Sequence, residues 1–242
     1  MQMDAKKQVN HKDSTWKFFD QIAPNYDRLN RVLSAGIDQY WRKQLIKKIP
    51  QKSNLYVIDL ATGTGDVILE LLKKRSDDVS YVLGMDKSKG MLAIAEQKFA
   101  QFQGASIKFE HADAQKIPVN DHTADVVTMA FGIRNVPDVS ASLKEMHRIL
   151  KEDGSVYILE FSLPKISLLR YVYLMYFRYV LPLVGKFVSK HPYAYQYLNE
   201  SVETFEYGSQ FAQKMKDAGF KKVTFDSLSF GIATIYKASK NA

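Results

Sequence analysis

Short apolar runs alternate with amphipathic stretches through the middle of the chain. The apolar runs have the length of buried strands and cover residues 55–60, 81–85, 107–109, 124–131 and 156–161. Apolar residues recur at helical spacing in the segments between them, 67–74, 89–102 and 139–150. Gly154 is expected to make the turn into the last run. This alternation predicts a doubly wound, mostly parallel α/β sheet with helices on both faces.

The two ends of the chain are patterned differently. Residues 14–49 look helical and are interrupted by proline and glycine. Near the C-terminus, a helix is expected at 211–218, and two alternating segments, 223–230 and 232–238, predict an antiparallel pair at a sheet edge. We expect one domain over residues 1–242. A helical N-terminal extension is expected over 1–50 and the cofactor-binding core over 51–162. A helical lid or insertion is expected over 163–205, and a C-terminal helix with strands over 206–242.

Composition narrows the class of protein. The 242 residues are 46% hydrophobic and 25% charged, which is typical of a globular protein with a sizeable core. The chain has no cysteine, which excludes disulfides and thiolate metal sites. No grouping of His, Asp and Glu has metal-ligand spacing, so no metal is predicted. No apolar run approaches ~20 residues, and the N-terminus lacks a signal-peptide pattern, so a cytoplasmic location is expected.

A glycine-containing turn follows the first apolar run, in the sequence Asp59-Leu-Ala-Thr-Gly-Thr-Gly-Asp66. Glycines at such a strand–helix turn let the backbone approach a ligand closely. A dinucleotide fingerprint would need a third glycine at position 68, which is Ile68, and no phosphate-binding P-loop is present. Acids at both ends of the turn would repel phosphates and suit a cationic ligand.

Further acids follow the next two runs. Asp86 can accept both ribose hydroxyls of a nucleoside, and Asp113 can accept from an adenine amino group. Together with Asp59, these acids match the groups of a nucleoside that carries a cationic amino-acid tail. This constellation resembles the class I methyltransferases that use S-adenosyl-L-methionine. The predicted cofactor-binding residues are Asp59, Thr62, Gly63, Thr64, Gly65, Asp86, Lys87, Asp113, Ala114 and Ala130.

Three other stretches resemble the quinone-biosynthesis C-methyltransferases. They are Tyr26-Asp-Arg-Leu-Asn30 with Ser34 and Trp41, Phe131-Gly-Ile-Arg-Asn-Val136, and Arg148-Ile-Leu-Lys151 with Gly154 and Glu160-Phe-Ser162. The resemblance runs from about residue 15 to 238. It implies a class I methyltransferase fold and methylation of the ring of demethylmenaquinol, a lipophilic quinol. The chain departs from the family pattern at Asp38, where a histidine is usual.

The same resemblance implies catalytic roles for Arg134, Asn135 and Tyr26. Arginine remains protonated in proteins, so Arg134 is expected to stabilise an oxyanion on the acceptor. Tyr26 would orient the acceptor hydroxyl or relay its proton. In the alternative interpretation, Arg134 pairs with a nearby acid and Tyr26 only packs.

Residues 166–190 are rich in aromatic and aliphatic side chains. From residue 161 to 190 there are five basic residues and no acidic one, within a net charge of +8. The segment is either a peripheral contact with the inner face of a membrane or a core or homodimer-packing helix. Nucleic acid is disfavoured, because the loop after the fourth strand lacks the Asn/Asp-Pro-Pro-aromatic motif of base-modifying amino-methyltransferases.

Other functions stay open at this point. One is methylation of a ubiquinone precursor or another lipophilic acceptor, such as a phenol or sterol. The other is a non-catalytic membrane adaptor that binds the cofactor. The fold alone does not choose among them.

Overall fold

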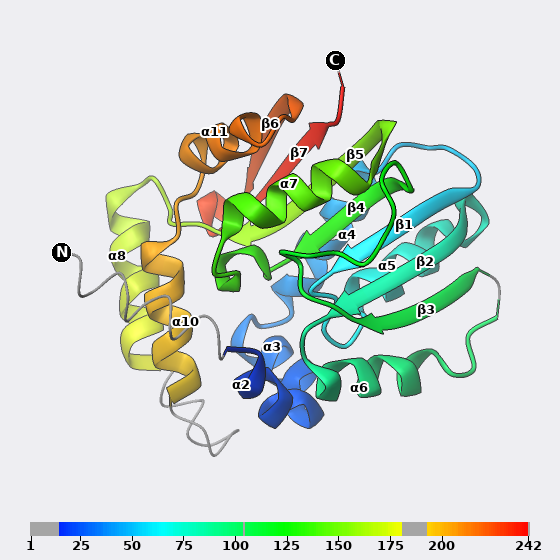
Figure 1. Ribbon diagram of the computed structural model, residues 1–242. Helices are drawn as coiled ribbons and strands as arrows, with labels where there is room; N and C mark the ends of the chain where they lie inside the picture. The colour runs from blue at the N-terminus through cyan, green and yellow to red at the C-terminus, as the bar shows by residue number, and fades with distance from the viewer. Residues whose placement is uncertain (1–14, 104, 181–192, 242) are drawn as a thin grey trace.

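The computed structural model describes residues 15–103, 105–180 and 193–241, and the statements below refer to those residues. Seven strands form one sheet in the order β3-β2-β1-β4-β5-β7-β6 (Figure 1). All neighbouring pairs from β3 to β5 are parallel, and β7 is antiparallel to both of its neighbours. The strands are β1 (Leu55–Leu60), β2 (Val79–Asp86), β3 (Ser106–His111), β4 (Ala124–Ala130), β5 (Leu150–Phe161), β6 (Lys221–Leu228) and β7 (Ala233–Ser239).

Helices precede, separate and follow these strands. The α-helices are α2 (Thr15–Ile22), α3 (Tyr26–Leu33), α4 (Ile37–Lys48), α5 (Asp66–Arg75), α6 (Lys89–Phe99), α7 (Val139–Ile149), α8 (Ser167–Met175), α10 (Tyr193–Thr204) and α11 (Ser209–Asp217). Shorter turns are η1 (Ala23–Asn25), η2 (Ser76–Asp78), η3 (Ile133–Asn135), the π-helix η4 (Tyr176–Val180) and η5 (Ser229–Gly231). Helices therefore lie in the segments of the chain where apolar residues recur at helical spacing instead of strand spacing.

The sheet is covered on both faces (Figure 1). Helices α7 and α11 pack on one face through Leu143, Met146 and Phe211, among others. Helices α4 and α5 pack on the other face, where Leu45 and Leu71 are fully buried. Two buried faces explain why the central strands read as continuous apolar runs, since neither face meets water. The predicted doubly wound α/β sheet is confirmed, as is the antiparallel pair at its edge.

The bend predicted at Gly154 lies inside strand β5, whose first residue, Leu150, pairs with Ala124 of β4. The next paired residue of β5 is Ser155, which lies opposite Val126, so β5 advances five residues where β4 advances two. The extra residues 151–154 form a bulge that bends the chain at the predicted position. A Cβ at Gly154 would lie 2.9 Å from Leu150 Cδ2 and from Lys151 O, so the glycine is needed for close packing. The helix predicted at 89–102 ends at Phe99.

The N-terminal helices and the segment after β5 pack against each other beside the carboxyl ends of the strands. Leu29 of α3, Tyr173 of α8 and Val202 of α10 share one apolar cluster. The hydroxyl of Tyr176 donates to the carbonyl of Leu33 at 2.7 Å. No helix within the described residues is both long and apolar enough to cross a membrane. Residues 181–190 of the predicted amphipathic segment lie outside the described residues.

Candidate active site

Two cavities adjoin at the carboxyl ends of β1, β2 and β4, where the strand order reverses direction and ligands of α/β sheets usually bind. The smaller, of about 110 Å³, is here called the cofactor cavity, and the larger, of about 460 Å³, the acceptor cavity. Phe19, Tyr26 and Phe131 line both. These aromatic side chains therefore form the boundary across which a group would pass from one cavity to the other.

The structure brings six of the predicted cofactor-binding residues to the cofactor cavity. They are Gly63, Asp86, Lys87, Asp113, Ala114 and Ala130. The carboxylate of Asp86, at the end of β2, accepts from the backbone N–H of Gly63 and of Ser88, both at 2.8 Å. Burial raises the pKa of Asp86, although these N–H groups oppose the shift. Lys87 Nζ lies 2.6 Å from Asp113, whose position after β3 follows the prediction.

The other four predicted residues, Asp59, Thr62, Thr64 and Gly65, do not line the cavity. Asp59 is buried and accepts from the hydroxyls of Thr62 at 2.7 Å and Thr128 at 2.6 Å. Burial raises the pKa of Asp59 to about 6 in spite of these bonds. The hydrogen bond between Asp59 and Thr62 therefore anchors the loop that carries Gly63 to the end of β1.

The turn geometry explains the two glycines. Gly63 has φ +58° and Gly65 has φ +82°, where residues with a Cβ are disfavoured. At Gly65 a Cβ would also lie 2.7 Å from the ring of Phe99. Asp66, the acid thought to suit a cationic ligand, instead pairs with Arg31 at 2.7 Å and Lys98 at 3.1 Å. Cations of the protein thus already balance its charge.

Sequence reasoning missed the residues that close the cofactor cavity from the N-terminal side. Trp16 and Phe19 of α2 line it, together with Met91 of α6. Asp20 anchors helix α2 to the start of α6. Its Oδ1 accepts from Ser88 Oγ at 2.5 Å and from the N–H of Gly90 at 2.8 Å. No local motif marks these side chains, because their role depends on how the extension folds back.

The acceptor cavity has an aromatic floor and apolar walls. The rings of Phe131 and Phe161 lie 4.6 Å apart between centroids, and Trp41 lies 5.9 Å from each. Phe131 has φ +58°, a strained conformation for a bulky residue. Its neighbour Gly132 permits this, since a Cβ there would lie 2.6 Å from that of Ala61. Backbone strain held in place by packing is typical of functional sites.

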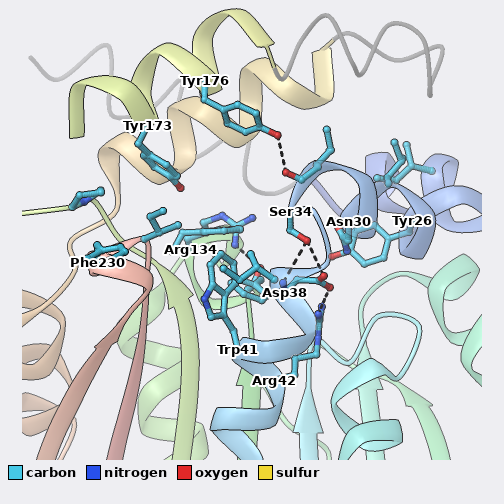
Figure 2. Close-up of a pocket in the computed structure, with 18 of the residues that line it drawn as sticks. Tyr26, Asn30, Ser34, Asp38, Trp41, Arg42, Arg134, Tyr173, Tyr176 and Phe230 are labelled. Atoms are coloured by element: carbon cyan, nitrogen blue, oxygen red, sulfur yellow. Dashed lines mark hydrogen bonds and ion pairs between the residues drawn. The ribbon is translucent and has the colours of Figure 1, made fainter. Parts of the chain in front are cut away.

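Arg134 extends from η3 to the wall of the acceptor cavity (Figure 2). Its Nη1 donates to Glu160 Oε1 at 2.7 Å and to the carbonyl of Phe131 at 2.6 Å, and its Nε donates to Ser201 Oγ at 3.3 Å. Burial raises the pKa of Glu160, whereas the charge of Arg134 lowers it. Arg134 thus both pairs with a buried acid and lines the cavity, so the two sequence interpretations are compatible.

Tyr26 and Asn135 take different positions. Tyr26 lines both cavities, and burial raises its pKa despite a hydrogen bond with Asn30, so its phenol stays protonated at neutral pH. Asn135 lines only the cofactor cavity, where its Nδ2 lies 3.4 Å from the carbonyl of Phe131. The structure thus places Arg134 at the acceptor cavity, Asn135 at the cofactor cavity and Tyr26 between the two.

A cluster of ion pairs beside the acceptor cavity was not expected from the sequence. Asp38, the position where the sequence was expected to depart from the pattern of the resemblance, is buried and accepts from Ser34 Oγ at 2.8 Å. Its other oxygen pairs with both Arg31 and Arg42, and both arginines also approach Asp66. Figure 2 shows Ser34, Asp38 and Arg42 in line beside the cavity. A single acid therefore connects α3 with α4.

Metal-ligating residues do not gather near this site. Within residues 15–103, 105–180 and 193–241, no group of three or more His, Cys, Asp or Glu side chains is arranged to hold a metal ion. The expectation of no metal stays a prediction for the whole chain.

Comparisons with known proteins identify the family. A profile described as the ubiE/COQ5 methyltransferase family matches residues 5–240. The chain belongs to this family. It is 46% identical over 225 residues to the ubiquinone/menaquinone biosynthesis C-methyltransferase UbiE of Geotalea daltonii, covering 93% of this chain and 95% of that protein. It is 38% identical to the demethylmenaquinone methyltransferase of Chlorobaculum parvum, covering 96% of this chain and 95% of that protein.

Solved structures agree on the fold. A putative methyltransferase in complex with the Trm112 activator of Haloferax volcanii has a TM-score of 0.66 and 17% identity, covering 93% of this chain and 98% of that one. An S-adenosylmethionine-dependent methyltransferase of Thermotoga maritima has a TM-score of 0.65 and 18% identity, covering 93% and 99%. The predicted class I methyltransferase fold is confirmed.

The protein is an S-adenosyl-L-methionine-dependent methyltransferase. The residues of the cofactor cavity fit this group, because its carboxylates, Asp86 and Asp113, would accept hydrogen bonds from a nucleoside, and its walls are apolar at Met85 and Ala112. When bound, S-adenosylmethionine supplies an electrophilic methyl group on a sulfonium. The residues of the cofactor cavity would hold the cofactor next to the boundary formed by Phe19, Tyr26 and Phe131.

Proposed function

We propose that this methyltransferase converts demethylmenaquinol to menaquinol by methylating a carbon of the quinol ring. The observation that carries the proposal is the acceptor cavity, which is large, mostly apolar and separated from the cofactor cavity only by shared aromatic side chains. A flat, lipophilic ring matches a floor made of Trp41, Phe131 and Phe161. The name of the Chlorobaculum parvum relative, demethylmenaquinone methyltransferase, points to the same acceptor.

The geometry supports the following chemistry. The ring carbon forms the new bond to the methyl group, the sulfur keeps the electron pair of the broken bond, and the ring hydrogen leaves as a proton. An ionised quinol hydroxyl makes this carbon nucleophilic, and the guanidinium of Arg134 lowers the energy of the resulting oxyanion. Tyr26 offers a protonated phenol at the boundary, where it orients the acceptor oxygen. The aromatic floor fixes the ring and excludes water.

Methyl transfer from labelled S-adenosylmethionine to chemically reduced demethylmenaquinone tests the function. We expect one ring-bound methyl group per product, identified by mass spectrometry. Asp86→Ala serves as the control, because it removes the predicted ribose acceptor and should abolish transfer by weakening cofactor binding.

A second quinol acceptor sharpens the same assay. A benzoquinol precursor of ubiquinone is included because the Geotalea daltonii relative is named for both pathways. Protein that binds the cofactor but methylates neither quinol would refute the proposal and favour another lipophilic acceptor, such as a phenol.

We also propose that α8 contacts the cytoplasmic face of a membrane. Leu168, Tyr171 and Val172 of this helix are 72%, 63% and 57% exposed, far more than apolar side chains in a core. Lys165 and Arg170 are exposed in the same segment and suit anionic lipid. Val172 also lines the acceptor cavity, so a quinol tail would pass from the cavity toward the lipid.

A second copy of the chain is the competing occupant of this apolar face. Co-sedimentation with anionic vesicles, together with size-exclusion chromatography, separates the two. Binding to vesicles by a monomer supports the membrane contact. A stable dimer that does not bind vesicles would refute it and favour the homodimer.

A further inference from the structure

Phe230, in the turn η5 between β6 and β7, is a large apolar side chain that folding does not account for. It is 79% exposed, so it adds little to the core, and its φ of +59° is unfavourable for a residue with a Cβ. Ser229 before it has φ +48° and Gly231 after it has φ +96°, so three successive residues are left-handed. Glycine would fit position 230 with less strain, and an observed strain of this kind points to a function.

Hydrogen bonds within the protein hold the strained turn in place. Nε1 of Trp41, in the aromatic floor of the acceptor cavity, donates to Ser229 Oγ at 2.9 Å. On the other side of the turn, the hydroxyl of Ser162, which directly follows β5, donates to the carbonyl of Gly231 at 2.7 Å. The backbone on both sides of Phe230 is therefore fixed to the cavity floor and to the strand beside it.

Phe230 lies at the end of the acceptor cavity that is remote from the cofactor. It lines the acceptor cavity but not the cofactor cavity. Figure 2 shows it on the opposite side of the acceptor cavity from Tyr26, which marks the boundary with the cofactor cavity. The reacting ring must lie at that boundary, within reach of the methyl group. The part of the acceptor that reaches Phe230 is therefore a group attached to the ring.

Phe230 also belongs to an exposed apolar rim of this cavity. Leu169 and Val172 of α8 line the same cavity and are 36% and 57% exposed. Ile232, directly after η5, packs against the apolar cluster that contains Tyr173 of α8, so η5 and α8 adjoin. Covering such a rim with hydrocarbon is favourable, because it removes apolar surface from water. The rim therefore fits an aliphatic chain.

We propose that Phe230 is a specificity-determining residue that binds the aliphatic chain of the acceptor next to its ring. It thereby favours ring substrates that carry a chain over those that do not. This inference rests on the proposed function, because it takes a lipophilic quinol as the acceptor. Since the protein's own hydrogen bonds hold the strained turn, its backbone needs no reordering when the chain binds.

Equilibrium binding of two matched ligands, measured by anaerobic titration calorimetry, tests the inference. Both are 1,4-dihydroxynaphthalenes kept reduced with dithionite, one with a geranyl chain on the ring and one without a chain. S-adenosylhomocysteine replaces the cofactor, so that no methyl group is transferred. Phe230→Gly removes the side chain and relieves the positive φ. The preference for the geranyl ligand is expected to fall roughly ten-fold, while the midpoint of thermal unfolding stays the same or rises.

Phe225→Gly is the matched control. Phe225 is an aromatic residue of the neighbouring strand β6, is 36% exposed and does not line the acceptor cavity. The same substitution should lower the unfolding midpoint here, because glycine weakens a strand, and leave the preference between the ligands unchanged. Phe230→Tyr keeps a ring at the rim and should keep most of the preference. Loss of the preference in both glycine variants, or in neither, would overturn the inference.

A membrane contact is the competing role for this exposed aromatic side chain. If Phe230→Gly keeps the wild-type preference but loses affinity for anionic vesicles, Phe230 contacts lipid instead of the acceptor chain and the inference is overturned. Protein that prefers the geranyl ligand through Phe230, but methylates neither ligand when S-adenosylmethionine is supplied, would refute the proposed function alone. Failure of the inference and failure of the function are therefore distinguishable.

Discussion

The two adjoining cavities differ in how the chain builds them. The cofactor cavity is small and is formed mainly by the loops that directly follow β1, β2, β3 and β4. The acceptor cavity is about four times larger, and its walls come from α2, α3, α4, α8, η3 and η5. When a site is built from consecutive strand ends, its binding residues fall in short sequence motifs. A site made from distant helices owes its shape to packing and ion pairs, so substitutions there affect folding and function together.

The largest combined effect on folding and function is expected when Arg134 is removed. Arg134→Ala leaves Glu160 fully buried without its cation, which typically costs about 3–5 kcal/mol. Urea denaturation is expected to show a loss of this size together with the loss of methyl transfer. Arg134→Met combined with Glu160→Leu should recover much of the stability but none of the activity. A single variant that loses less than about 1 kcal/mol would contradict a structural role for the pair.

Asp59 offers the corresponding test on the cofactor side. Its pKa of about 6 in the folded protein is above the usual value of 3.8, so the folded state holds this proton more tightly than the unfolded state. The contribution of Asp59 to stability is therefore greatest below pH ~4, decreases as the pH rises to ~6, and is constant above that.

Asp59→Asn mimics the protonated acid, so it should stabilise the cofactor-free protein at pH 7 by up to about 3 kcal/mol. At pH 4 the difference from wild type should be small. Unfolding curves measured between pH 4 and pH 8 check this. A difference that does not change with pH would mean that the carboxylate is ionised throughout.

Gly132→Ala acts on the boundary between the cavities. The added Cβ would lie 2.6 Å from Ala61 Cβ and 3.0 Å from Met129 Cε, and such overpacking costs about 1–3 kcal/mol. Both cofactor affinity and methyl transfer should fall, because Phe131 would move. In Gly63→Ala, the ring of Tyr26 is the only group of the described residues within 4 Å of the added Cβ, so the cost comes from the positive φ. This variant should mainly weaken cofactor binding. Equal effects of Gly132→Ala and Gly63→Ala on cofactor affinity and on methyl transfer would contradict this expectation.

The sequence predicted the sheet well, because strands buried on both faces are marked by local apolar runs. Strand β1 coincides with the predicted run at 55–60. The chain bends at Gly154 as predicted, but it does so through a bulge inside β5 and not through a turn between two elements, because a glycine in a bulge has the same local signature as one in a turn. The cofactor residues that line the cavity follow strand ends, and that position is also local information.

The acceptor side was less predictable. Asp38 and Arg42 lie one turn apart on α4, but Asp66 begins α5, so the pairing of the cluster depends on how α4 packs against α5. The sequence does not show that Asp66 balances protein cations instead of a ligand. The burial and pairing of Arg42 are properties of the assembled structure. Motifs therefore identified Arg134 but not the second arginine that shares its cavity.

The smallest effect on stability, and a clear effect on membrane contact, is expected from Leu168→Gln combined with Tyr171→Gln. Both side chains are mostly exposed, so unfolding should change by only about 0.5 kcal/mol. Affinity for anionic vesicles should fall by roughly ten-fold, since two apolar groups no longer enter the lipid. Phe102→Gln is the control, because Phe102 is also partly exposed but follows α6, which lies away from α8 (Figure 1). Equal losses of vesicle binding in the two proteins would place the membrane contact elsewhere.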